Sequence, residues 1–162
     1  MTESHEYELL TPVEKDLLRR VKQVYVECGD LVGTPYRFAG GHNSLWLPSL
    51  SYADGIGAPG AGVDCSSGSS IALRAGGLCS NPRPPFPLSS GNFMGYGKPG
   101  AGRWLTVHAN THHMGLEFTI PRSLDPTGFY QNQWFQAANP TAGVGWITLD
   151  TTGMVSRHWP GC

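Results

Sequence analysis

One cysteine in the middle of the chain is placed where a thiol could do chemistry. The stretch GVDCSSGSSIALRAGGL (62–78) puts Cys65 directly after Asp64 and at the start of an apolar, helix-forming segment. The unpaired N–H groups at a helix N-terminus favour the thiolate, which is the nucleophilic form. Ordinary packing would explain the same position, because free cysteines are among the most buried residue types. Cys65 is therefore a candidate nucleophile, with a buried structural thiol as the alternative.

A nucleophilic thiol also needs a base, and histidine is the usual one. The segment HANTHHMGLEF (108–118) supplies His108, His112 and His113. On a strand, His113 and Gly115 would share one face and His112 would lie on the other, and spacing alone does not choose between the two faces. A zinc amidase that uses all three histidines is a second hypothesis. The opposite directions of His112 and His113 disfavour joint binding of one metal ion.

Two helices are expected to position these groups. The sequence TPVEKDLLRRVKQVYVECGD predicts a helix over 12–28, with Thr11 as N-cap, Pro12 at the first position and Glu14 closing a capping box. The second predicted helix starts at Cys65 or Ser66 and ends at Ala75 before two glycines, with Asp64 as its N-cap. This second helix would carry the candidate nucleophile.

The second half of the chain changes to the period of two that is typical of strands. Strands are predicted at 103–109, 112–120, 145–150 and 153–158, and the last two are expected to form a hairpin that turns at residues 151 and 152. Residues 33–62 and 80–102 contain much Gly and Pro and are expected to be irregular; a loop as long as the first is typically functional. Helices followed by antiparallel strands predict an α+β fold.

The composition fits one domain spanning residues 1–162. Only 14% of the residues are charged, with 22 glycines and 13 prolines, which indicates many turns around a modest core. A net charge of -1 gives no basic face, so nucleic acid is not an expected partner. No apolar run approaches the roughly 18 residues that a membrane span needs. The first residues show no signal-peptide pattern, so we expect the protein to be made in the cytoplasm.

The cysteines give no sign of a metal site or of another cofactor. Cys28, Cys65, Cys79 and Cys162 lie far apart in the chain and form no CxxC pair. A structural zinc site made of cysteine pairs is therefore not expected.

The order of these motifs resembles the NlpC-type cell-wall cysteine peptidases. GTPYRFAGG (33–41) is followed by DCSSG (64–68) at a helix start and then by HHMGL (112–116) on a strand, whereas the family typically shows PYxWGG, DCSG and HVGI segments. GRWLTVHAN (102–110) and SRHWPGC (156–162) are similar to segments of the phage-borne, actinobacterial branch. The glycine of DCSSG stands one place later than in the family.

The resemblance implies a fold, a reaction and a set of roles. The fold would be papain-like, with N-terminal helices packed on a small antiparallel sheet, and the substrate would be a peptidoglycan stem peptide. Cys65 would be the nucleophile and His113 the base. A third, orienting residue would come from Gln131, Asn132 and Gln133, among which we favour Asn132, and Gly115 would leave room for substrate. The substrate-binding residues would be Tyr36, as the pocket tyrosine of the family, and Asp64 and Ser66, which would contact the free amine of the peptide.

The resemblance further implies a phage endolysin or a virion-associated lysin. Such a protein would stay in the host cytoplasm until it is released to the cell wall, or it would form part of a phage tail beside other virion proteins. A non-catalytic virion or wall-binding module with the same fold is the remaining alternative.

Overall fold

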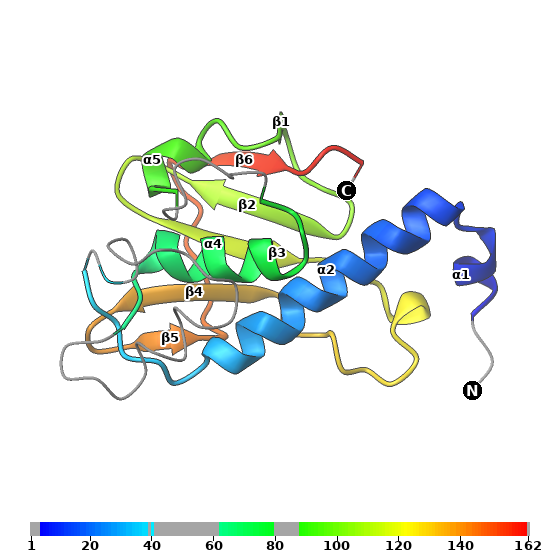
Figure 1. The fold of residues 1–162 in the computed structure, drawn as a ribbon, viewed down its shortest axis with the longest axis horizontal. Helices are drawn as coiled ribbons and strands as arrows, with labels where there is room; N and C mark the ends of the chain where they lie inside the picture. The colour runs from blue at the N-terminus through cyan, green and yellow to red at the C-terminus, as the bar shows by residue number, and fades with distance from the viewer. Residues whose placement is uncertain (1–3, 39, 41–61, 80–87, 162) are drawn as a thin grey trace.

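The fold is an antiparallel sheet with two helices packed on one of its faces (Figure 1). The computed structural model describes residues 4–38, 40, 62–79 and 88–161. Within these residues the sheet has six strands in the order β1-β6-β2-β3-β4-β5. The predicted order, with helices first and antiparallel strands afterwards, is confirmed.

The long helix α2 (Pro12–Leu31) starts where the sequence predicts and ends three residues later than predicted. Thr11 and Glu14 form the capping box, each side chain accepting the backbone N–H of the other residue. Gly29 does not end the helix, because Leu31 is completely buried two residues further on. Burial of a leucine is worth about 1.5–3 kcal/mol, more than the roughly 1 kcal/mol that a helical glycine costs.

Helix α4 (Cys65–Ala75) has the predicted bounds and packs against both α2 and the sheet. Its contacts with the sheet fall on β3 and β4, the two strands at the centre of the site described below. Helix α1 (His5–Leu9) precedes α2 and contacts the 3-10 turn η1 (Arg122–Leu124).

Strands β2 (Leu105–Ala109), β3 (Met114–Phe118) and β6 (Val155–His158) fall inside three of the four predicted strands. Strand β4 (Trp134–Asn139) pairs with β3 and with the short β5 (Gly143–Gly145).

The predicted hairpin between 145–150 and 153–158 is wrong. Strand β5 ends at Gly145 and pairs with β4, whereas β6 pairs with β2 and β1. Residues 146–150 leave the ladder because the carbonyls of Ile147 and Thr148 accept hydrogen bonds from a side chain, Gln136, instead of from a neighbouring strand.

The regions expected to be irregular are only partly within the described residues. Residues 39 and 41–61 lie outside them; before that gap, Tyr36 forms a parallel bridge with Val63. The region 80–102 contains two short elements that the sequence did not predict, α5 (Ser90–Phe93) and β1 (Lys98–Pro99).

The two faces of the sheet differ in chemistry. The face under α2 and α4 carries buried apolar side chains such as Val107, Leu116 and Phe135. The alternation along β2 and β3 turns His108 and Glu117 to the other face, which we call the outer face. In the described part of the chain, no helix is both long and apolar enough to cross a membrane.

Candidate active site

Cys65 is the first residue of α4, and the residue before it holds the start of the helix. The Oδ1 of Asp64 accepts the backbone N–H of Ser66 at 3.1 Å and that of Ser67 at 2.9 Å. It also accepts the hydroxyl of Ser66 at 3.1 Å. These bonds satisfy N–H groups that have no partner within the helix, so Asp64 fixes the turn that presents the thiol.

The second serine of DCSSG has a structural role. The Ser67 hydroxyl accepts the backbone N–H of Asp64 at 3.0 Å, which completes a second capping box around the thiol. Ser67 is fully buried, so its hydroxyl needs such a partner. The displacement of the glycine by one place therefore leaves the helix start intact.

The Cys65 thiol lies beside the peptide that joins His113 to Met114. The backbone N–H of Met114 interacts with the thiol and lowers its pKa, as do the N–H groups of Ser66 and of Cys65 itself. Because Met114 directly follows His113, the start of α4 and the start of β3 meet at this point.

Burial has the larger effect on the Cys65 thiol. The side chain is only 7% exposed, and this burial raises the pKa of the thiol, with a further rise from the negative charge of Asp64. The N–H groups at the helix start favour the thiolate, but burial and the charge of Asp64 outweigh them, so the net change in the pKa is a rise. A proton must leave this thiol before the sulfur can attack.

The imidazole of His113 is held by a glutamine. Its Nε2 lies 2.6 Å from the Oε1 of Gln136, a residue of β4 that is 6% exposed. The amide nitrogen of Gln136 donates to the carbonyl of Thr148 at 2.8 Å, which fixes the amide with Oε1 toward the imidazole. An oxygen at this point requires the proton to be on Nε2, so Nδ1 is left with its lone pair.

The position favoured for the orienting residue, Asn132, is not beside the histidine. Asn132 is exposed, and its backbone N–H donates to the hydroxyl of Tyr25 on the helical side of the sheet. It precedes Gln136 by four residues, which is roughly 13 Å along an extended chain. Gln131 and Gln133 also contact other groups, since Gln131 donates to Asp125 and Gln133 donates to Glu117.

The pairing register of β3 and β4, which the local sequence pattern does not give, identifies Gln136 as the residue beside His113. Leu116 pairs with Phe135 and Glu117 with Trp134, so the residue opposite Gly115 is Gln136. The expectation that Gly115 leaves room for substrate is wrong. A Cβ at Gly115 would lie 2.8 Å from Leu149 and 3.4 Å from the Cβ of Gln136, so its missing side chain makes room for these two residues.

A groove of about 320 Å³ opens beside Cys65. Tyr36, Asp64 and Ser66, the three residues expected to bind the peptide, all line it. Burial, followed by the charges of Cys65 and Asp64, raises the pKa of the Tyr36 hydroxyl. From the loop between β2 and β3, His112 also lines the groove.

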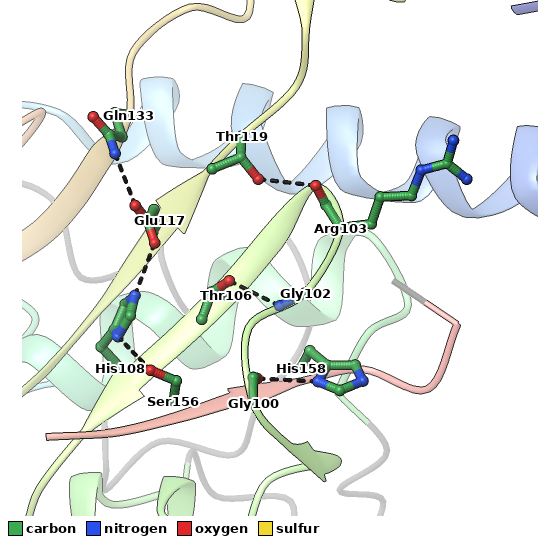
Figure 2. Close-up of polar contacts among 10 residues, drawn as sticks. All are labelled: Gly100, Gly102, Arg103, Thr106, His108, Glu117, Thr119, Gln133, Ser156 and His158. Carbon is green, nitrogen blue, oxygen red and sulfur yellow. Dashed lines mark hydrogen bonds and ion pairs between the residues drawn. The ribbon is translucent and has the colours of Figure 1, made fainter.

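The third histidine belongs to a different part of the molecule. Figure 2 shows His108 on the outer face between Glu117, 3.0 Å from its Nε2, and Ser156, 3.1 Å from its Nδ1. The Gln133 amide donates to the other oxygen of Glu117 at 2.8 Å. This network ties β6 to β2 and β3.

The three histidines therefore have three separate environments, which does not favour the zinc hypothesis. His108 is bound to Glu117, His112 faces the groove, and His113 is bound to Gln136. In the described ranges, no group of three or more His, Cys, Asp or Glu side chains is arranged to hold a metal ion.

Comparisons with known proteins identify the fold class of the chain. No family model matches the chain, and no curated protein matches it in sequence. Two solved structures share its fold, which confirms the predicted α+β, papain-like class.

The first is the peptidoglycan hydrolase RipB from Mycobacterium tuberculosis. It is 19% identical, with a TM-score of 0.59 over 98% of this chain and 72% of that chain. The second is the P60 domain of an antigen from M. avium subspecies paratuberculosis, 21% identical, with a TM-score of 0.57 over 87% of this chain and 96% of that chain.

Proposed function

We propose that this chain is a peptidoglycan hydrolase that cleaves an amide bond of a cell-wall peptide by a Cys–His mechanism. The observation that carries the proposal is the meeting of the Cys65 thiol with the His113–Met114 peptide, where Gln136 holds the imidazole. The fold shared with RipB, which is a peptidoglycan hydrolase, supports the choice of substrate.

In the first half of the proposed reaction, His113 acts as the base. Its Nδ1 takes the thiol proton of Cys65, and the sulfur attacks the carbonyl carbon of the scissile amide. We assign stabilisation of the negative oxygen that forms to the N–H of Cys65, which lies in the first turn of α4. The tetrahedral intermediate collapses to a thioester, and the leaving amine takes its proton from His113.

In the second half, water completes the hydrolysis. The Nδ1 of His113 accepts a proton from a water molecule, the resulting hydroxide attacks the thioester, and the peptide leaves as a carboxylic acid while the thiol recovers its proton. Gln136 is a positioning residue throughout, because its Oε1 keeps the other imidazole proton on Nε2.

The polar groups around the thiol are suited to the amino end of a peptide. Asp64 supplies a carboxylate, and Tyr36 and Ser66 supply hydroxyl groups in the same groove. We assign these three residues to binding of a free amine on the half of the substrate that becomes the acyl-enzyme.

We further propose that the protein acts at the cell wall as a phage endolysin or as a tail-associated lysin. The support for this is the likeness of GRWLTVHAN (102–110) and SRHWPGC (156–162) to the phage-borne branch. The described parts of these segments are paired in the fold, since β2 and β6 are neighbours.

The test is release of new amino groups from purified cell wall by the wild type and by Cys65→Ser and His113→Ala. Cys65→Ser should abolish release, and His113→Ala should lower it at least about 10²-fold, the usual loss for a general base. Asn132→Ala, an exposed polar residue before β4, is the matched control and should stay within about twofold of wild type. Thermal melts exclude unfolding.

Three results would overturn the mechanism. Release by Cys65→Ser at the wild-type rate would exclude the nucleophile. Loss of activity in EDTA with recovery in zinc would favour the histidine-based amidase. Tight binding to cell wall without any release of amino groups would favour a non-catalytic wall-binding module.

A further inference from the structure

The groove beside Cys65 has a second polar side that the proposed mechanism does not use. Ser90 and Thr111 line it together with His112. In Figure 1, α5 and the β2–β3 connection lie on one side of the start of α4, and the chain that follows α2 lies on the other. A bound peptide that crosses the thiol would therefore contact Asp64 with one half and His112 with the other.

The loop that carries His112 is held in a fixed shape. The Oδ1 of Asn110 accepts the backbone N–H groups of His112 and His113, each at 2.8 Å. The N–H of Asn110 donates to the carbonyl of His113 at 2.9 Å, and the Ser90 hydroxyl donates to the carbonyl of Thr111 at 3.3 Å. One short loop thus presents His112 to the groove and His113 to Gln136.

The two adjacent histidines differ in what their side chains contact. The imidazole of His113 is bound to Gln136, whereas that of His112 is exposed and has no hydrogen-bond partner among the described residues. Of the described residues that line the groove, His112 alone has a side chain that can carry a positive charge. A hydrogen bond from a protonated imidazole to a carboxylate is roughly twice as strong as one between neutral groups.

We propose that His112 forms a carboxylate subsite, which binds a free carboxylate on the leaving-amine half of the substrate. The subsite rests on the proposed function, because the assignment of the two halves uses the amine site at Asp64. The groove then matches a zwitterionic peptide, with its amine at Asp64 and its carboxylate at His112. Peptides whose carboxylate is converted to a carboxamide lose the charge and bind less well.

The test uses two synthetic peptides that differ only in this group. Both carry a free N-terminal amine, and the residue after the scissile bond has either a free carboxylate or a carboxamide. We expect wild type to favour the carboxylate peptide about tenfold in kcat/KM, mainly through KM. His112→Ala and His112→Gln should bring the ratio near one by weakening only the carboxylate peptide, and His112→Arg should keep the preference.

An exposed histidine far from the groove provides the matched control. His5→Ala in α1 should leave the ratio at the wild-type value. An unchanged ratio in His112→Ala would overturn the subsite. An equal loss on both peptides would also overturn it, because that result assigns His112 to the shape of the loop and not to carboxylate binding.

A binding measurement separates the subsite from the catalytic proposal. Cys65→Ser should bind the carboxylate peptide about tenfold more tightly than the carboxamide peptide, and the added His112→Ala should remove the difference. If this difference in affinity is found but the wild type does not cleave either peptide, the carboxylate subsite is supported and the proposed reaction is rejected. Equal affinity of Cys65→Ser for both peptides would reject the subsite, whatever the activity.

Discussion

The Nε2 of His113 lies 2.6 Å from the Oε1 of Gln136, and the same amide donates to the carbonyl of Thr148 at 2.8 Å. The second bond determines the direction of the first, because only the amide nitrogen can donate to a carbonyl. Thr148, in the segment without strand structure between β5 and β6, thus sets the tautomer of a histidine at the start of β3. The proposed base therefore depends on three separate segments of the chain.

Replacement of Gln136 should lower activity without removing the base. Gln136→Ala leaves the proton of His113 free to occupy either nitrogen, and we expect a loss of about 10²-fold in the rate of amino-group release. Gln136→Asn keeps the amide but shortens its reach, so its loss should be smaller. Asn132→Ala is the control, and an equal loss in Asn132→Ala and Gln136→Ala would contradict the assignment of the orienting role to Gln136.

The start of α4 could be predicted because its signals are local. Asp64 is an N-cap with its donors two and three residues away, and two glycines follow the last helical residue. The capping box of Thr11 and Glu14 is equally local. Such patterns need only the sequence around the element.

The orienting residue could not be read from local pattern, because it depends on register. Gln136 is opposite Gly115 only because Glu117 pairs with Trp134, and a slip by one residue would turn Gln136 to the other face. The predicted strand 145–150 failed for a related reason. Its alternation is compatible with a strand, but the carbonyls at Ile147 and Thr148 are used by a side chain.

A side chain at position 115 should disturb Gln136 directly. A Cβ there would lie 2.8 Å from Leu149 and 3.1 Å from the carbonyl oxygen of Phe135. We expect Gly115→Ala to cost about 1–3 kcal/mol of unfolding free energy and to lower activity by more than this loss of stability explains. Gly145→Ala, whose Cβ would meet only Val32, at 3.7 Å, within the described part of the chain, is the matched control. Urea denaturation and amino-group release measure both effects, and equal behaviour of the two variants would contradict the proposed crowding.

The buried thiol of Cys28 predicts a loss of stability in alkaline solution. Cys28 is 0% exposed, and burial, with a smaller effect from Glu27, raises the pKa of the thiol in the folded state. The folded protein therefore holds a proton that the unfolded chain loses above about pH 8.5. The stability is fully present below that pH, and the contribution of Cys28 falls by about 1.4 kcal/mol per pH unit above it.

The measurement for Cys28 is denaturant unfolding between about pH 7 and pH 10, in a Cys65→Ser background that removes the second thiol with a raised pKa. Addition of Cys28→Ala should lower overall stability at every pH, because it leaves a small cavity, and should make the alkaline slope less steep. Identical slopes with and without Cys28 would show that its thiol does not titrate differently in the folded state.

The raised pKa of the Cys65 thiol predicts how the candidate nucleophile reacts in the absence of substrate. Burial and then the charge of Asp64 disfavour the thiolate, so the thiol is protonated near neutral pH in the free protein. Because only the thiolate is alkylated, the rate of reaction with iodoacetamide should increase about tenfold per pH unit from about pH 6 and keep increasing beyond about pH 8.5, where an ordinary thiol levels off. Mass spectrometry of the peptide that contains Cys65 gives the rate, and Cys28, which is completely buried, reports any unfolding. A rate that is already constant near pH 6 would mean that a thiolate–imidazolium pair with His113 exists before substrate binds, and the proton transfer proposed as the first step would then precede binding.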